Sequence, residues 1–350
     1  MSYTTIKKPS DFFNTKLYTG NGSTNAITGV GFQPDFTWIK SRTEGYGHSL
    51  FDAVRGVTKA IASEGTGAEY TFSTGLTAFG SDGFTLGSGT VVNNNSQNHA
   101  SWNWKANGAG VANTDGSISS TVSASATSGF SIVKFTPTGS ASTIGHGLGV
   151  APKMIIVKNL GGTSTWSVYH SSLGATKFLR LEDTNAVGTG TGWWNDTAPT
   201  SSVFTLGSNI NAVDTIAYCF ADVQGYSKFG SYTGNGSTDG TFVYTGFSPA
   251  FVMVKRTDGA NNWNIKDNRR NNASTSFNIN PRNATLLPNT SDADQDANAL
   301  DFLSNGFKNT STGNDVNASG GNFIYMAFAE QPLVGDNPAT ARWLCSYLLT

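Results

Sequence analysis

The sequence predicts an all-β protein made of three tandem β-sandwich modules with a jelly-roll-like arrangement of strands. A ten-residue phrase occurs three times, at residues 31–40, 149–158 and 246–255; each copy is a Gly- and Pro-containing turn followed by an apolar run ending in Lys. The copies lie roughly 100 residues apart, too far for solenoid or propeller units and far enough for domains. The 41 Gly, with frequent Ser, Thr and Asn, fit short strands joined by tight turns.

The composition excludes several classes of protein. The 350-residue chain has a net charge of −1 and only 13% charged residues, so it lacks the basic excess of a nucleic-acid-binding protein. No apolar run reaches the roughly 20 residues that a membrane helix needs, and we expect no membrane insertion. Residues 1–9 have no apolar core after their basic residues, unlike a secretory signal. Two cysteines, Cys219 and Cys345, are too few for a disulfide framework.

In chain order, the repeated phrases divide the sequence into three expected modules. These modules, called repeats 1, 2 and 3 below, are residues 1–106, 129–222 and 223–332. Residues 107–128 are rich in Ser and Thr and are expected to form either a linker or an added edge strand. No such insert precedes repeat 3, so repeats 2 and 3 are expected to dock more closely than repeats 1 and 2. Residues 333–350 are a tail, whose Trp343 and Leu344 are expected to bury against a neighbour, within the chain or in another subunit.

Each repeat follows the same order of strands. An Asn-Gly turn at 18–24 is copied at 232–238, and this dipeptide between strand-like runs favours a turn with positive φ. No Gly-Lys-Ser/Thr follows it, so it is not a phosphate loop. The last strand alternates large and smaller side chains; the large ones are Trp102 and Trp104, Tyr218 and Phe220, and Met326 and Phe328. We predict that these large residues fill the core between the two sheets of each sandwich, at about 10 Å spacing.

An Asp stands three residues before an Arg after the second strand of repeats 1 and 3. The pairs are Asp52–Arg55 and Asp267–Arg270, and repeat 2 has His170 and Leu173 at these positions. A catalytic carboxylate held by an Arg clamp is one interpretation. The favoured interpretation is an Asp that caps a turn and pairs with the nearby Arg.

The sequence contains no recognisable catalytic or metal-binding motif, and we predict no enzymatic activity, no catalytic residues, no metal and no cofactor. The four histidines are His48, His99, His146 and His170, and none has metal-ligand spacing. There is no Gly-x-Ser-x-Gly elbow. A polysaccharide-cleaving enzyme would need two carboxylates about 5–9.5 Å apart, and no such pair is evident.

Three alternating aspartates, Asp292, Asp294 and Asp296, resemble the start of a calcium loop. Ala297 stands where such a loop needs Gly, and no Glu occupies the last ligand position. The favoured prediction is therefore a solvated acidic loop, with a low-affinity cation site left open.

The best candidates for ligand contact are Trp193, Trp194, Asn195 and Asp196 in the long loop of repeat 2. Indole faces and planar polar side chains supply the stacking and hydrogen bonds that a sugar ring needs, so we predict a glycan platform. The alternative is that one indole folds over the sheet edge as part of the core. More generally, the loops that follow the three repeated phrases differ in length and chemistry, so recognition is expected there.

Several phrases together carry a resemblance to a known module. They are the Tyr-Thr-Gly-Asn-Gly turn at 18–22, the Pro-containing strand ending in Lys, and the segments at 166–170, 216–222 and 225–232. The chain resembles a repeated, lectin-like module of tail fibres and other virion proteins of marine tailed bacteriophages, most closely over 129–330. Repeat 1 departs from the pattern, with His48 in place of Trp, and with Lys105 and Ala106 in place of Ala-Asp. The resemblance assigns no catalytic residue.

The resemblance implies a structural or host-recognition role in a phage particle. The first expectation is a tail fibre or similar appendage, located in the virion and favoured to be a homotrimer, that contacts other virion proteins and a host surface polysaccharide. The alternative is a capsid decoration or peripheral baseplate protein without ligand binding. A polysaccharide depolymerase is the third hypothesis.

Overall fold

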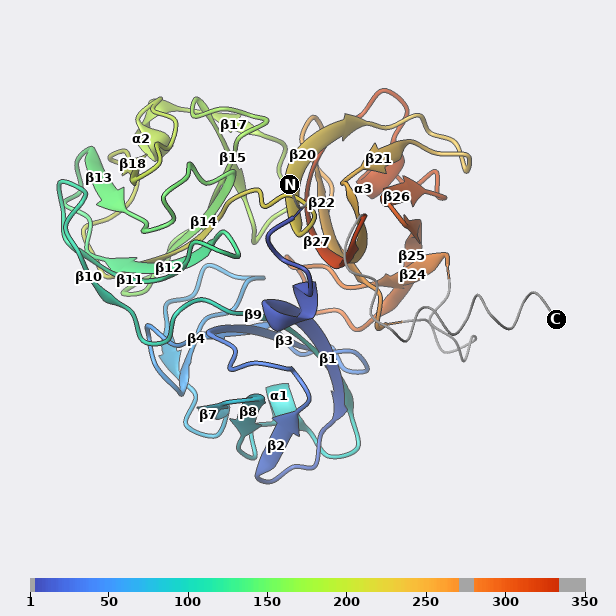
Figure 1. Cartoon of the computed structure of the whole chain (residues 1–350), viewed down its shortest axis with the longest axis horizontal. Helices are drawn as coiled ribbons and strands as arrows, with labels where there is room; N and C mark the ends of the chain where they lie inside the picture. Colours follow the sequence, from blue (N-terminus) through green and yellow to red (C-terminus); the bar gives the residue numbers. More distant parts are fainter. Residues whose placement is uncertain (1–3, 271–279, 334–350) are drawn as a thin grey trace.

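The computed structural model describes residues 4–270 and 280–333. Over these ranges the protein is all-β with several antiparallel sheets, which confirms the predicted class (Figure 1). Helical structure in this part of the chain is confined to short turns: η1 (Pro9–Asp11), α1 (Thr90–Asn93), α2 (Thr191–Trp194) and α3 (Asn314–Asn317). No helix among the described residues is long and apolar enough to cross a membrane. The expectation for Trp343 and Leu344 falls outside the described residues.

Repeat 1 contains nine strands. They are β1 (Phe13–Thr19), β2 (Asn25–Thr28), β3 (Phe36–Ser41), β4 (Ser49–Asp52), β5 (Lys59–Ala60), β6 (Tyr70–Thr71), β7 (Leu76–Gly80), β8 (Gly83–Leu86) and β9 (Asn98–Trp104). A four-stranded sheet has the order β1-β9-β3-β4, and a three-stranded sheet has the order β2-β8-β7. The small β5–β6 hairpin follows, and the residue after β5, Ile61, forms an antiparallel bridge with Leu50 of β4.

Repeat 2 and the segment before it form the largest sheet. The strands are β10 (Val111–Asn113), β11 (Ser120–Ser125), β12 (Phe130–Phe135), β13 (Ser142–Gly145), β14 (Met154–Asn159), β15 (Ser167–His170), β16 (Lys177–Arg180), β17 (Gly188–Thr189), β18 (Val203–Leu206) and β19 (Thr215–Phe220). Eight strands run in the order β10-β11-β12-β19-β14-β15-β16-β17, and β13 pairs with β18. Part of the insert at 107–128 thus adds two strands to the edge at β12.

The described residues of repeat 3 form two sheets of four strands each. Its strands are β20 (Ser227–Thr233), β21 (Phe242–Tyr244), β22 (Phe247–Arg256), β23 (Trp263–Asp267), β24 (Arg282–Thr285), β25 (Gln295–Leu303), β26 (Gly306–Asn309) and β27 (Asn322–Pro332). The orders are β20-β27-β22-β23 and β21-β26-β25-β24. In all three repeats the strand of the repeated phrase (β3, β14 or β22) pairs antiparallel with the last strand (β9, β19 or β27).

The repeated phrase forms a turn and a fully buried strand. Its first glycines, Gly31, Gly149 and Gly246, have left-handed φ values of 91°, 74° and 82°. A side chain would strain this conformation, which explains the glycine in each copy. The apolar run that follows is buried at every position in β3 and β14, because neighbouring strands flank it and both faces of its sheet are covered.

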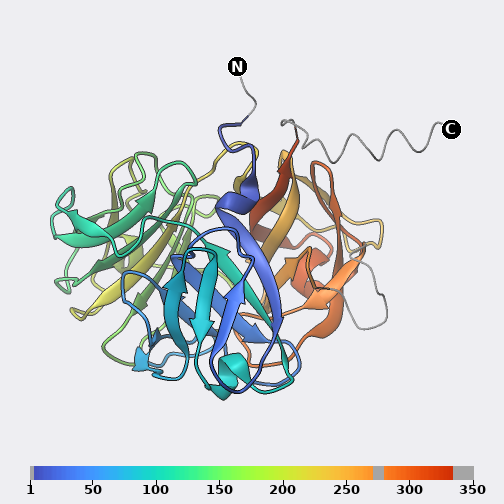
Figure 2. The same cartoon turned by 60° about the horizontal axis from the view of Figure 1, so that its bottom comes forward.

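The large side chains of the last strands lie in one apolar cluster shared by all three repeats, not between two sheets of one repeat as predicted. Trp104, Phe220 and Phe328 form a triangle around its middle. Their ring centroids are 6.3 Å (Trp104–Phe220), 5.7 Å (Trp104–Phe328) and 6.1 Å (Phe220–Phe328) apart. The smaller residues between them, such as Cys219 and Ala327, lie in separate clusters within their own repeats. Figures 1 and 2 show the three repeats gathered around this common centre.

Each repeat also contacts the next one through an arm, which is the loop of the hairpin that comes after its second strand. We define the arms as residues 62–69, 180–187 and 287–294. At equivalent positions the arms donate backbone hydrogen bonds to the neighbouring repeat: Glu69 N to Leu160 O (3.0 Å), Val187 N to Thr257 O (2.8 Å) and Asp294 N to Arg42 O (2.8 Å). Repeat 1 thus contacts repeat 2, repeat 2 contacts repeat 3, and repeat 3 contacts repeat 1. The three junctions are alike in this respect, whereas the sequence predicted closer docking of repeats 2 and 3.

The lysine that ends each copy of the phrase is buried at a junction. Lys158 Nζ donates to Thr66 O of the first arm at 2.9 Å, and Lys255 Nζ donates to Thr184 O of the second arm at 3.1 Å. Lys40 donates instead to Ser41 O within its own repeat, at 2.9 Å. Burial lowers the pKa of all three lysines to about 8.

Candidate functional site

The two indoles of α2 lie in different environments. Trp194 is 1% exposed and packs edge-on against Tyr169, with ring centroids 5.6 Å apart. It belongs to the apolar cluster of repeat 2 and, as placed, has no face open to a ligand. Trp193 is half-buried and lies on the ring of Phe178, with centroids 4.5 Å apart and planes inclined by 32°. Trp193 is therefore the indole of the predicted platform that remains near the surface.

Asn195 and Asp196 follow directly after α2 and are both exposed. Their φ values of 52° and 49° lie in the left-handed region, and Asn195 ends the helix as its C-cap. Short polar side chains tolerate this conformation better than most, so the turn alone accounts for both residue types.

Phe178 connects Trp193 to a surface pocket of about 330 Å³. The pocket is lined by Phe178, Leu179, Arg180, Asn185, Ala186 and Gly188. Phe178 faces Gly188 across the β16–β17 hairpin, and a Cβ at Gly188 would lie 2.3 Å from the phenyl ring. Glycine is therefore required at 188 for this ring position. We call Phe178, Arg180, Trp193 and the pocket beside them the aromatic–arginine site.

Arg180 is the charged member of this site. Its guanidinium carbon lies 5.9 Å from the centroid of Phe178, within the range of a cation–π contact. Its Nη1 is 3.7 Å from Asp183 Oδ2, while its Nε is buried without a hydrogen-bond partner among the described residues. An aromatic face, a guanidinium and an exposed amide at Asn185 provide stacking and hydrogen bonding for a polar ring-shaped ligand.

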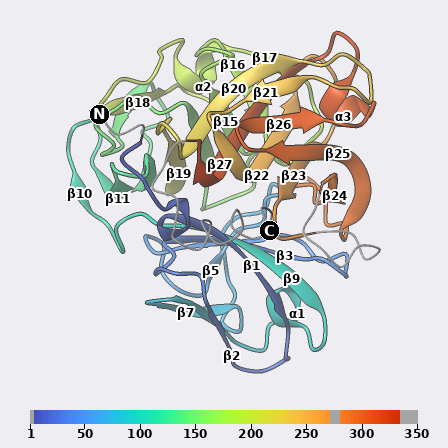
Figure 3. The ribbon, with the colours of Figure 1, turned by 45° about the vertical axis from the view of Figure 1, so that its right-hand side comes forward.

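The site stands at the border between repeats 2 and 3. Arg180 O accepts a hydrogen bond from Trp263 Nε1 at 2.8 Å, and Asn261 N donates to Thr184 O at 2.9 Å. Figure 3 shows β16 and β17 beside β20 and β21 of repeat 3. Contacts to the backbone of residues 180–187 from a second repeat fix one wall of the pocket.

The described residues of repeats 1 and 3 form no equivalent of this site. The β5–β6 hairpin pairs Ala60 with Tyr70, and β24–β25 pairs Thr285 with Gln295, where repeat 2 pairs Phe178 with Gly188. Ala62 and Leu287 take the place of Arg180, because they accept the corresponding ring hydrogen bonds of the neighbouring repeat.

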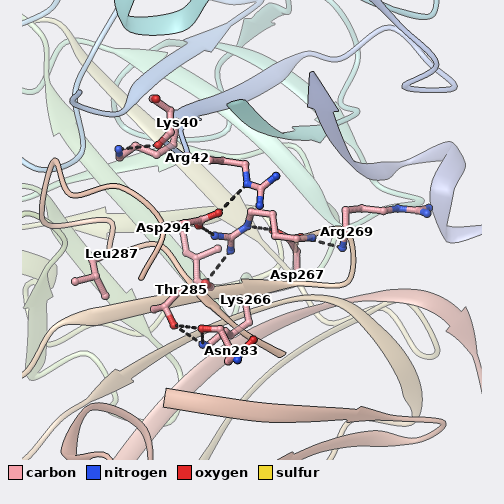
Figure 4. A network of polar contacts seen from close by, with 12 residues as sticks. Lys40, Arg42, Lys266, Asp267, Arg269, Asn283, Thr285, Leu287 and Asp294 are labelled. Atoms are coloured by element: carbon pink, nitrogen blue, oxygen red, sulfur yellow. Dashed lines mark hydrogen bonds and ion pairs between the residues drawn. The ribbon is translucent and has the colours of Figure 1, made fainter. Parts of the chain in front are cut away.

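The acidic stretch at 292–296 contains a structural ion pair rather than only solvated carboxylates. Asp294 Oδ2 is 2.7 Å from Arg42 Nε of repeat 1 (Figure 4), and its Oδ1 is 2.5 Å from Arg270 Nη1 of repeat 3. Asp294 is thus bound to two guanidiniums and holds the third arm on repeat 1. Asp292 accepts from Thr290 at 3.0 Å, and no group of three His, Cys, Asp or Glu in the described ranges could hold a metal ion.

The Asp–Arg pairs of repeats 1 and 3 cap turns and form ion pairs, as the favoured interpretation stated, but they are completely buried. Asp52 Oδ1 accepts from the Arg55 backbone at 2.8 Å, and its Oδ2 is 2.5 Å from Arg55 Nε. Asp267 and Arg270 repeat this geometry, at 2.8 Å and 2.6 Å. The Arg270 guanidinium and hydrogen bonds keep the pKa of Asp267 below its usual value although desolvation opposes this.

Both carboxylates also accept a hydrogen bond from the neighbouring repeat. Tyr218 Oη donates to Asp52 Oδ2 at 2.8 Å, and Trp102 Nε1 donates to Asp267 Oδ2 at 2.9 Å. Because both carboxylates are fully buried and bonded to a neighbouring repeat, they serve the junctions between repeats.

Histidines at the junctions are held in the neutral form. His170 faces Tyr325 O with Nε2 at 3.2 Å and accepts from Ser172 N with Nδ1 at 3.2 Å. His48 faces Leu287 O with Nε2 at 3.0 Å and accepts from Trp38 Nε1 with Nδ1 at 2.8 Å. A second ring proton would displace an accepted hydrogen bond, and burial lowers the pKa of His170 to about 4 and that of His48 to about 3.

Sequence reasoning did not point to Phe178 or Arg180. The signal was weak: Phe178 and Arg180 alternate in the short run Lys177–Arg180, which places both on one face of a strand. Only the packing of Trp193 on Phe178 distinguishes this run from an ordinary exposed hairpin.

These features define a class: an all-β chain of three repeats closed into a ring around one aromatic core, with an aromatic–arginine pocket on repeat 2. The chain belongs to the family described as "Domain of unknown function (DUF7483)", whose model matches residues 8–332. The match spans all three repeats, so the family corresponds to the whole ring. Comparison with curated proteins and with solved structures finds no match.

Proposed function

We propose that this chain is a non-enzymatic, glycan-binding structural protein, and that the aromatic–arginine site of repeat 2 contacts the sugar. The observation that carries the proposal is the Trp193–Phe178 pair beside a pocket that also presents Arg180 and Asn185. Exposed aromatic faces flanked by planar polar groups suit sugar rings. Asn195 and Asp196 lie exposed at the end of α2 and are proposed as additional contacts.

The virion setting follows from the resemblance of the repeats to phage tail-fibre and other virion modules. We propose that the chain is a tail fibre or tail appendage, partnered by other virion proteins, that meets a host surface polysaccharide. The paired sheets of repeats 1 and 3 support the description of each repeat as a jelly-roll-like β-sandwich. Homotrimer formation remains part of this proposal, and it would bring nine repeats together.

The binding test uses the full chain and a glycan array, followed by titration with the best ligand. Trp193→Ala is expected to weaken binding by about two- to twelvefold, because stacking on one aromatic ring contributes about 0.5–1.5 kcal/mol. Tyr70→Ala is the matched control: Tyr70 is a 42% exposed aromatic on the corresponding hairpin of repeat 1, and its loss should leave binding unchanged. Equal losses in both variants, or no sugar bound at all, would remove the glycan role.

A purely structural virion role is the second candidate, favoured by a different surface. The edge strand β21 exposes Phe242 and Tyr244 by 44% and 55%. Exposed aromatics on an edge strand, which has one unpaired side, suit contact with another protein. If Phe242→Ser/Tyr244→Ser abolishes incorporation into particles while Trp193→Ala has no effect on particles or adsorption, the structural role is preferred.

A further inference from the structure

We propose that the aromatic–arginine site selects an anionic sugar, with Arg180 pairing to a carboxylate or sulfate group on the ring. This inference rests on the proposed glycan-binding function and specifies its ligand. The pocket lining contains one charged side chain, Arg180, and no carboxylate. A neutral sugar would leave that charge without a new partner, whereas an anionic sugar would satisfy it.

The orientation of Arg180 favours this role. Its guanidinium lies over the Phe178 ring, which leaves the edge of the planar group for in-plane hydrogen bonds. The Nε is buried and lacks a hydrogen-bond partner in the described structure, whereas the side chain as a whole is 35% exposed, so a ligand would reach its Nη groups. Carboxylate and sulfate oxygens match two adjacent donors of this group.

The carboxylate of Asp183 does not use all the hydrogen-bond donors of the Arg180 guanidinium. Asp183 Oδ1 accepts from Asn185 N at 2.8 Å, and Asp183 Oδ2 accepts from Asn185 Nδ2 at 2.7 Å. Its contact to Arg180 Nη1, at 3.7 Å, is longer than a hydrogen bond. Asp183 thus orients Asn185 at the pocket wall and leaves Arg180 able to take a second anion.

Two other charged groups nearby are engaged elsewhere. Glu182 Oε2 accepts a hydrogen bond from Trp166 N at 3.0 Å, inside repeat 2. Lys177 lies on the same strand as Arg180, but an odd number of residues away, so it points to the opposite face and contacts Thr189 Oγ1 at 2.6 Å. Lys177 therefore offers a charge-matched control for Arg180.

In the part of the chain that the structure describes, the site occurs only in repeat 2, which gives the proposal a stoichiometry. Ala62 and Leu287 stand at the positions of Arg180 in repeats 1 and 3, and neither side chain can pair with an anion. Although three repeats are present, we expect one anionic sugar to bind per chain.

The experiment is isothermal titration of the full chain with trigalacturonate and with its fully methyl-esterified form, which has the same rings without the charges. A sulfated galactose trisaccharide forms a third arm that distinguishes sulfate from carboxylate as the preferred anion. We expect one site per chain and at least tenfold tighter binding of an anionic probe than of the ester. Arg180→Gln should remove this preference, and Lys177→Gln should retain it.

The outcomes separate this inference from the proposed function. Equal affinity for charged and neutral probes, with Trp193→Ala weakening both, overturns anion selection and leaves glycan binding intact. Three sites per chain, or equal losses in the Arg180 and Lys177 variants, show general charge attraction and overturn the assignment to Arg180. Absence of binding by every probe, together with an empty glycan array, overturns both proposals. Thermal unfolding of each variant checks that the fold is retained.

Discussion

Two of the three junctions between repeats contain a buried ion pair, and the third contains a neutral histidine. Asp52–Arg55 and Asp267–Arg270 each receive a hydrogen bond from a side chain of another repeat, Tyr218 or Trp102. In repeat 2 the equivalent positions are His170 and Leu173, and the side chain from repeat 3 is Met326, which has no donor. His170 instead uses the backbone carbonyl of Tyr325.

The difference shows that, at these equivalent positions, the Asp–Arg pair occurs only where a neighbouring repeat supplies a side-chain donor to the carboxylate. A buried carboxylate is costly unless its remaining lone pairs are hydrogen-bonded. Tyr218 and Trp102 meet that condition, whereas Met326 cannot. A neutral imidazole needs only one acceptor and one donor, which the backbone provides. In each junction the buried hydrogen-bond donors and acceptors therefore suit one another, although all three junctions have the same backbone arrangement.

Removing the junctions altogether should have the largest effect. Residues 107–222, expressed alone, would expose the face of repeat 2 that includes Phe130, Met154 and Phe220 in the shared cluster. We expect this fragment not to fold as a monomer, measured by near-ultraviolet circular dichroism and by dispersion of amide signals in NMR. The full chain should unfold in one cooperative transition. A fragment that is monomeric and unfolds cooperatively would contradict the shared core.

Removing the carboxylate of one buried Asp–Arg pair should have the next largest effect on stability. Asp267→Ala removes the carboxylate that pairs with Arg270 Nε and accepts from Trp102 Nε1, while Arg270 keeps its second partner Asp294, so the free energy of unfolding should fall by about 3 kcal/mol in urea denaturation. The double variant Asp267→Ala/Arg270→Ala should lose less than the sum of the single losses. Asp11→Ala, in an exposed pair of the same spacing with Lys8, is the control and should change stability little. Additive losses would argue against coupling.

The junction that contains neutral His170 should make the stability of the protein depend on pH. The pKa of His170 is about 4 in the folded protein and about 6.5 when unfolded, so the unfolded chain binds the extra proton between these values. Stability from this group is present above pH 6.5 and is lost as pH falls toward 4, by up to about 3 kcal/mol. His170→Gln, which retains a donor for Tyr325 O, should show a shallower loss over that window in urea denaturation. Parallel pH profiles for the two proteins would show that His170 does not contribute.

Removing a ring-to-backbone hydrogen bond, which all three junctions contain, should have the smallest effect on stability, and the effect should be similar at each junction. Trp166→Phe keeps an aromatic ring but loses the 3.0 Å hydrogen bond from Nε1 to Ala62 O. Trp263→Phe loses the matching bond to Arg180 O, at 2.8 Å. Each should lower the free energy of unfolding by about 1–2 kcal/mol, measured by urea denaturation. A difference of several kcal/mol between the two variants would show that these junctions are not equivalent.

Part of the aromatic–arginine site could be predicted from residue patterns in the sequence, and part could not. Neighbouring indoles, Asn and Asp made 193–196 the candidate, and Trp193 does lie near the surface. The sequence could not indicate that Trp194 turns inward, because two successive residues on a short helical turn need not share an environment. Phe178 and Arg180 precede the loop by more than ten residues, and only the hairpin and the packing of α2 bring them to Trp193.

The sequence by itself determined the strands and their threefold repetition, because glycine turns, apolar runs and the alternation of large residues are local properties of the chain. It also determined that Asp52 and Asp267 would cap turns, since the Arg follows three residues later. Only the tertiary structure decided which neighbour each strand face meets. Alternation distinguishes two faces of a strand but does not name their partners, and in β9, β19 and β27 both faces are buried. Closing the ring therefore directs Trp104, Phe220 and Phe328 into one common core, and places the ion pairs and lysines at the junctions around it.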